Sequence, residues 1–160
     1  MATNELSMRL WHERELLEML LFKLEVQQLL LASGNGRWMH LATREIEQVL
    51  DRLRTTGIAR VVDASAVAEE WGASESATLR ELVEHAPNAA WRDVFADHLR
   101  VLTQLVAEIG QLRDTNVQQL NTVMRATQET LTGLGTDSGE YTTGGARARD
   151  DAARIVDTEM

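Results

Sequence analysis

The sequence predicts an all-α protein: a long antiparallel helical hairpin or bundle with a short helix, a very long C-terminal helix and a flexible tail. The composition favours helices, because the 160 residues include a single proline and a 4% aromatic share beside abundant Leu, Ala, Glu, Arg and Gln. Apolar residues recur at steps of three and four along three long segments, which is the period of an amphipathic helix. A hydrophobic share of 44% suffices for one domain with a real core.

The first two expected helices form the hairpin. The first covers residues 3–32 and ends at residues 33–36, Ser-Gly-Asn-Gly, where glycines supply the backbone freedom for a reversal. The second covers residues 37–71, with a weak point at residues 55–57 and Gly72 as its C-terminal cap. The first helix carries a leucine stripe, widened by other apolar residues: Leu6, Leu10, Leu17, Leu20, Leu24 and Leu31, with Leu21, Phe22, Val26, Leu29 and Leu30 beside them.

A short helix and a very long one should follow the hairpin. Ser74 is expected to cap a helix over residues 75–85, which Pro87 closes, and Asn88 to cap a helix over residues 89–131. Alternating steps of four and three give that long helix a heptad seam. The seam comprises Trp91, Phe95, His98, Leu102, Leu105, Ile109, Leu112, Asn116, Gln119 and Val123.

Beyond Gly133 the chain is rich in Gly and Thr and poor in core residues. Such a composition buries too little apolar surface to offset the entropy of ordering. We therefore expect a helical domain over residues 1–132 and a flexible tail over residues 133–160, in which residues 147–156 could form a helix on a partner.

Charge and residue usage exclude several classes of protein. A net charge of −9 and the absence of a Lys/Arg stripe argue against a nucleic-acid partner. The absence of cysteine excludes disulfides and thiol-bound metal. The N-terminus lacks the order of a signal peptide, and Lys23 and Glu25 interrupt the most apolar stretches, so we expect a cytoplasmic chain without stable membrane insertion.

The histidines do not form a known catalytic or metal-binding pattern. His12-Glu13 begins like a zinc-protease helix, but Leu16 stands where the second histidine of that motif belongs. His40 with Arg44 faintly resembles a histidine phosphotransfer bundle, although Thr43-Arg44 replaces the expected Lys-Gly. We predict that the chain is not an enzyme and uses no metal and no other cofactor.

The last third of the long helix is a candidate partner surface. Its apolar residues extend beyond the length of helix that the hairpin can cover. They therefore either bind a partner or pack in the core. Asn116 on the seam either fixes the register of the helix or sits at the edge of a binding site. A second copy of the chain is also an open alternative as the occupant. The apolar line comprises Val117, Leu120, Val123, Met124 and Leu131.

The order of the parts resembles the FlgN family of flagellar export chaperones. A long N-terminal helix and a Leu-rich return lead to Trp71-Gly72-Ala73, then to Thr78-Leu79-Arg80-Glu81-Leu82-Val83 and Ala86-Pro87. The long helix contains the Asn-centred stretch of residues 114–121, and a Gly/Tyr tail follows over residues 135–145. The resemblance covers about residues 5–145.

The resemblance implies a cytoplasmic chaperone of flagellar type III secretion. Such a chaperone binds the C-terminal helical segments of the two hook-filament junction proteins and prevents their premature assembly. It also implies that Tyr141 docks on the export gate. The implied partner-binding residues lie in the last helix: Asn116, Val117, Leu120, Val123, Met124 and Leu131.

Two other functions compete with this interpretation. The size and acidity are also typical of a secreted helical-hairpin export substrate, but Trp71-Gly72 is not a Trp-X-Gly turn. The second competitor is a phosphotransfer-like signalling bundle that uses His40.

Overall fold

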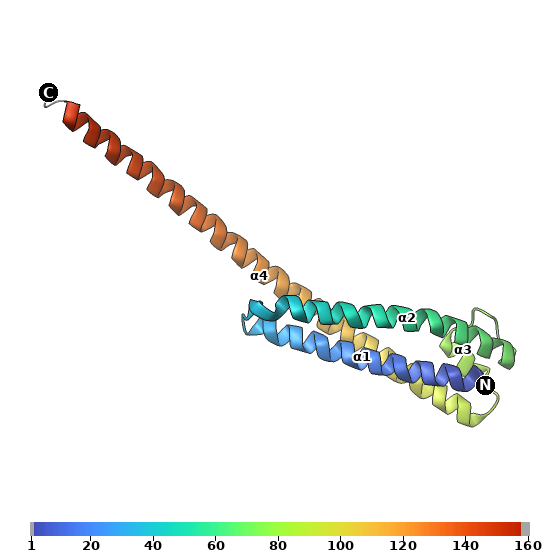
Figure 1. Ribbon diagram of the computed structural model, residues 1–160. Helices are drawn as coiled ribbons and strands as arrows, with labels where there is room; N and C mark the ends of the chain where they lie inside the picture. The colour runs from blue at the N-terminus through green and yellow to red at the C-terminus, as the bar shows by residue number, and fades with distance from the viewer. Residues whose placement is uncertain (1, 158–160) are drawn as a thin grey trace. The chain divides into compact units, whose positions relative to one another are not determined.

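The computed structural model describes residues 2–157, with side chains for residues 2–136, and every regular element among them is helical (Figure 1). The predicted all-α class is therefore confirmed. The chain divides into two compact units, Met1–Gln118 and Gln119–Met160. The elements in order are α1 (Ala2–Ala32), the 3₁₀ turn η1 (Gly36–Trp38), α2 (Met39–Trp71), α3 (Leu79–Glu84) and α4 (Ala89–Asp157).

Helices α1 and α2 form the predicted antiparallel hairpin and lie side by side in the first unit (Figure 1). Gly34 turns the chain with a φ of 68°, and Gly72 ends α2 with a φ of 69°, a region that favours glycine because it has no Cβ. The predicted weak point at residues 55–57 does not interrupt α2. The Thr55 hydroxyl donates to the carbonyl oxygen of Asp51 at 3.2 Å, and Thr56 is buried, so both threonines are accommodated within the helix.

The short helix α3 begins later than predicted, and the expected cap at Ser74 is wrong. Thr78 is the N-cap: its hydroxyl accepts from the Glu81 N–H at 3.3 Å, while the Glu81 carboxylate accepts from the Thr78 N–H at 2.7 Å. This reciprocal pair satisfies two backbone donors, which a lone serine at position 74 does not do. Asn88 does cap α4 as predicted, because its Oδ1 accepts from the Trp91 N–H at 2.9 Å.

Side chains from all four helices build the core of the first unit. Within α4, the predicted seam is buried at Phe95, His98, Leu102, Leu105 and Asn116. Trp71 and Trp91 pack on the Phe95 ring at centroid distances of 5.4 and 5.8 Å. The main buried cluster comprises Leu6, Leu10, Leu17, Val67, Ala68, Leu82, Phe95, Leu102 and Leu105, and a smaller one comprises Leu20, Leu24, Ile46 and Val49.

The second unit consists of α4 beyond residue 118, and α4 is described to Asp157, further than the expected end at residue 131. Threonine hydroxyls in this stretch donate to the carbonyl oxygen four residues earlier, which satisfies them within the helix. Thr127 donates to Val123 at 2.9 Å, and Thr130 donates to Ala126 at 2.9 Å. The boundary between a domain at residues 1–132 and a tail at residues 133–160 stays a prediction.

Candidate partner-binding surface

Apolar side chains are exposed along α4 from Val117 onward. They recur at intervals of three, four and seven residues, which places them on one face of a helix. Val117 belongs to the first unit and the others to the second. Leu134, three residues after Leu131, extends the line and was missed by the sequence prediction, although its spacing would have revealed it. The exposed fractions are 49% for Val117, 39% for Leu120, 46% for Val123, and 61% for each of Met124, Leu131 and Leu134.

Asn116 is the exception among the six predicted partner-binding residues, because its side chain is only 3% exposed. Its Nδ2 donates to the Leu24 carbonyl oxygen at 2.9 Å and to Gln27 Oε1 at 3.0 Å. These bonds tie α4 to α1 within the first unit. Of the two roles left open by the sequence, this geometry favours fixing the register of α4.

Tyr141, the predicted export-gate residue, lies outside the residues whose side chains the structure describes. Its docking role therefore stays a prediction. Residues 147–156, expected to form a helix on a partner, belong to α4 in the structure, and a role of a partner in that helix stays a prediction.

No group of three or more His, Asp or Glu side chains that could hold a metal ion occurs within the described part of the chain. His40 is exposed on α2. The His12 ring lies 3.8 Å from the Glu15 carboxylate, and the His85 ring contacts the Glu81 carbonyl oxygen at 2.9 Å near the end of α3.

His98 is the buried histidine, 1% exposed, and it contacts α1 from α4. Arg14 Nη1 lies 3.4 Å from Nδ1, and the Ser7 hydroxyl lies 3.4 Å from Nε2. A guanidinium only donates, so Nδ1 accepts and Nε2 carries the proton of a neutral ring. The Trp11 ring meets His98 edge-on at 5.1 Å. Burial lowers the pKa of His98, Arg14 lowers it further, and the Asp97 carboxylate opposes them.

Because the pKa of His98 is lower in the folded state, the unfolded state binds more protons just below the ordinary value of 6.5. Stability contributed by neutral His98 is therefore present at neutral pH and lost as the pH falls through that window. We expect urea unfolding to give a lower free energy of unfolding at about pH 5.5 than at about pH 7.5. Replacing the ring by His98→Gln should remove this part of the pH dependence.

Glu13 provides the internal comparison for that experiment. Burial raises the pKa of its carboxyl, while Arg60 lowers it, so its protonation favours the folded state as the pH falls. Its effect has the opposite sign to that of His98 and is common to wild type and His98→Gln. If the two proteins lost equal stability on acidification, His98 would not be the responsible group.

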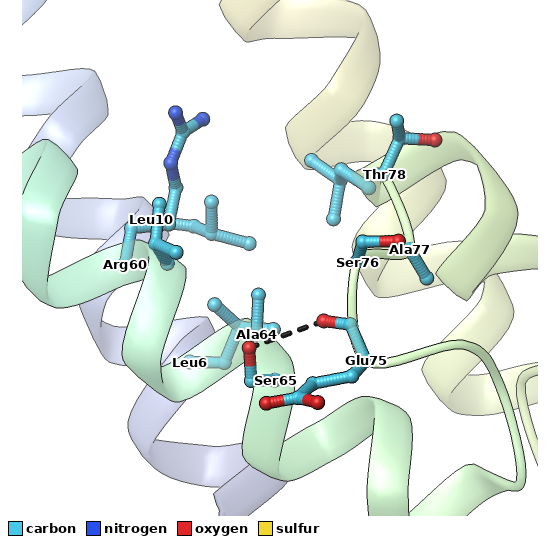
Figure 2. Close-up of a pocket in the computed structure, with 11 residues that line it drawn as sticks. Leu6, Leu10, Arg60, Ala64, Ser65, Glu75, Ser76, Ala77 and Thr78 are labelled. Carbon is cyan, nitrogen blue, oxygen red and sulfur yellow. Dashed lines mark hydrogen bonds between the residues drawn. The ribbon is translucent and has the colours of Figure 1, made fainter.

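A groove of about 490 Å³ lies between α1, α2 and the segment that leads to α3 (Figure 2). Leu6, Leu10 and Ala64 line it on the hairpin side, and Thr78 lines it on the opposite side. The Ser65 hydroxyl donates to the Glu75 carbonyl oxygen at 3.1 Å and ties the segment to α2. The groove can accommodate apolar groups, since aliphatic side chains make up much of its lining.

Among the described residues, no helix has the length and apolar character needed to cross a bilayer. A helical protein that exposes an apolar helix face is typical of the class of protein-binding proteins, since such faces recognise amphipathic helices of other chains.

Comparison with known protein families identifies which kind of protein-binding protein this is. The family model described as FlgN protein matches residues 1–149, and the chain belongs to the FlgN family. This membership indicates a flagellar export chaperone that binds flagellar substrate proteins. Neither the comparison with curated proteins nor that with solved structures gave a match.

Proposed function

We propose that the chain is a cytoplasmic chaperone for the hook-filament junction proteins. It binds their C-terminal amphipathic helical segments, prevents premature assembly and delivers them to the flagellar type III export gate. The observation that carries this proposal is the exposed apolar line of α4 on a chain of the FlgN family.

The apolar line has the form that a helical client requires. An amphipathic client helix would bury its own apolar face on these side chains in a coiled-coil-like arrangement. Completing the burial of a half-exposed leucine or valine contributes roughly 1 kcal/mol, and ordering of the client offsets part of this sum. The resulting complex holds the client by several modest contacts, which suits a protein that must release it. The contacting residues are Val117, Leu120, Val123, Met124 and Leu131, with Leu134 at the end of the line.

Asn116 has a supporting role in this proposal. Its bonds to Leu24 and Gln27 anchor α4 one residue before the exposed line begins at Val117. Its role is therefore within the first unit and not in direct contact with the client.

The test is co-expression with each junction protein of the same organism, followed by size-exclusion chromatography. Wild type should co-elute with at least one of them. The double variant Leu120→Asp, Val123→Asp places two carboxylates where the client's apolar face would lie, and we expect it to weaken the complex by at least about 30-fold. Both side chains are exposed, so the variant should keep the wild-type helical circular dichroism.

A matched control comes from α2, where Ile58 and Val62 are 67% and 66% exposed. The variant Ile58→Asp, Val62→Asp introduces the same charge at an exposed apolar site on another helix and should bind the client like wild type. Failure of wild type to bind either junction protein would refute the proposal. Equal loss in both double variants would refute the placement on α4.

Delivery to the gate is proposed to use Tyr141. Comparing the amount of junction protein exported by cells that carry wild type or Tyr141→Ala tests this step, provided that client binding is unchanged. Unchanged export would assign gate docking to another part of the chain.

A further inference from the structure

Helix α1 has a second apolar face, here called the outer face. Its buried leucines point to the core, yet other large apolar side chains lie on the opposite side of the helix, at spacings of three or four residues except for one step of eight between Trp11 and Met19. Phe22, for example, stands two residues from the buried Leu20 and Leu24, nearly half a turn away. The outer face comprises Met8, Trp11, Met19, Phe22 and Leu29, which are 71%, 51%, 41%, 58% and 69% exposed, together with the partly buried Val26.

The outer face is long and narrow. From Met8 to Leu29 it extends for about 30 Å at 1.5 Å per residue, the length of a helix of about 20 residues. A stripe of this shape matches the apolar side of an amphipathic helix. Exposed apolar runs on this scale mark interaction sites.

The charges beside the outer face are acidic. Glu15, Glu18 and Glu25 are exposed. Glu15 stands four residues from both Trp11 and Met19 and so lies on the face itself, whereas Glu18 and Glu25, seven residues apart, lie along one side of it. Among the described side chains Glu18 and Glu25 form no ion pair, and Glu15 has only the His12 ring at 3.8 Å. The face therefore presents carboxylates that lack a cationic partner.

The cations of α1 near this face are already engaged within the first unit. The Arg14 guanidinium pairs with Asp97 at 3.1 Å and lies 4.1 Å over the Trp11 ring. The Lys23 ammonium pairs with Glu45 at 2.9 Å. They do not neutralise the glutamates, so the outer face is apolar, with one carboxylate on it and two along one side.

We propose that the outer face of α1 is a second docking surface, which binds an amphipathic helix of another protein that carries Lys or Arg on and beside its apolar stripe. Charge complementarity selects this occupant. A second copy of α1 would oppose glutamates to glutamates, since α1 contains five glutamates and three Lys/Arg in a chain of net charge −9. The proposal does not rest on the chaperone function, because it concerns α1 and not α4.

The experiment titrates labelled peptides into the full chain and follows fluorescence anisotropy. One designed helix of about 20 residues carries a leucine stripe flanked by lysines, and its matched partner carries glutamates in their place. We expect the lysine peptide to bind at least about tenfold more tightly. Raising the salt concentration should reduce this preference, because the glutamates are solvent-exposed.

Three variants locate the site. Phe22→Asp with Leu29→Asp should weaken binding of the lysine peptide at least about tenfold, whereas Ile58→Asp with Val62→Asp should not. The triple reversal Glu15→Lys, Glu18→Lys, Glu25→Lys should transfer the preference to the glutamate peptide. Circular dichroism and urea unfolding confirm that each variant is folded.

The outcomes are separable from those of the junction-protein test. The Leu120→Asp, Val123→Asp variant should keep binding the lysine peptide, which distinguishes α1 from the α4 line. Equal binding of both peptides, or binding that survives Phe22→Asp with Leu29→Asp, would overturn the proposal. A dimer in sedimentation that this α1 variant abolishes would instead assign the outer face to a second copy.

Discussion

The variant Phe95→Ala should lower the free energy of unfolding by about 3–5 kcal/mol. Phe95 is 0% exposed and belongs to the main core cluster, to which all four helices contribute. Three rings surround it: Trp71 at 5.4 Å, Trp91 at 5.8 Å and His98 at 6.2 Å. Alanine removes these contacts and leaves a cavity that three large rings cannot easily fill.

Urea unfolding followed by circular dichroism measures this effect, and a loss of this size is a large part of the roughly 5–15 kcal/mol that stabilises a typical domain. The adjacent Val94 provides the control, because it is 38% exposed on the same helix turn. Val94→Ala should cost less than about 1 kcal/mol, in proportion to the small area it uncovers. Equal losses in the two variants would mean that Phe95 is not at the centre of the core.

The second large effect is expected for Asn116→Asp. The side chain has nearly the same size, but a carboxylate cannot donate to the Leu24 carbonyl oxygen at 2.9 Å or to Gln27 Oε1 at 3.0 Å. It would lose both bonds and place a negative charge beside two acceptors at a position that is 3% exposed. We expect a loss of at least about 3 kcal/mol at neutral pH, which should shrink on acidification as the carboxyl group is protonated.

Asn116→Leu separates the charge from the shape. It also removes the bonds to Gln27 and Leu24, but it adds no charge and eliminates Asn116 Oδ1, a buried atom without a hydrogen-bond partner. We expect its free energy of unfolding to lie within about 1 kcal/mol of that of wild type. Leucine at a seam position loses the bonds that fix the register but gains apolar packing. If Asn116→Asp unfolded at the same urea concentration as wild type, Asn116 would not be the buried anchor of α4.

Several elements followed from the sequence alone because their causes are local. Gly72 ends α2 because a left-handed backbone there favours glycine, and Asn88 starts α4 because its side chain bonds a backbone N–H three residues away. The seam from Phe95 to Leu105 also followed, since heptad spacing is a property of the chain. The exposure of α4 from Val117 to Leu131 agrees with the apolar line read from the same spacing.

The sequence predictions of the α3 cap and of a weak point in α2 were wrong because two local signals competed at each place. Ser74 and Thr78 are both capping residues, and only the reciprocal bonding between Thr78 and Glu81 decides between them. Residues 55–57 have low helix propensity, but packing on α1 keeps Thr56 buried inside a continuous α2.

The sequence by itself determined the helical class, most helix ends, the core seam and the family, because these depend on spacing and local capping. Only the tertiary structure decided which faces stay uncovered. From the sequence, Phe22 and Leu29 were predicted to widen the core stripe of α1, yet both lie on its outer face. Asn116 was predicted as a partner-binding residue, yet it is buried against Leu24. Periodicity places a residue on a helix face, but whether that face is buried depends on where the neighbouring helices pack.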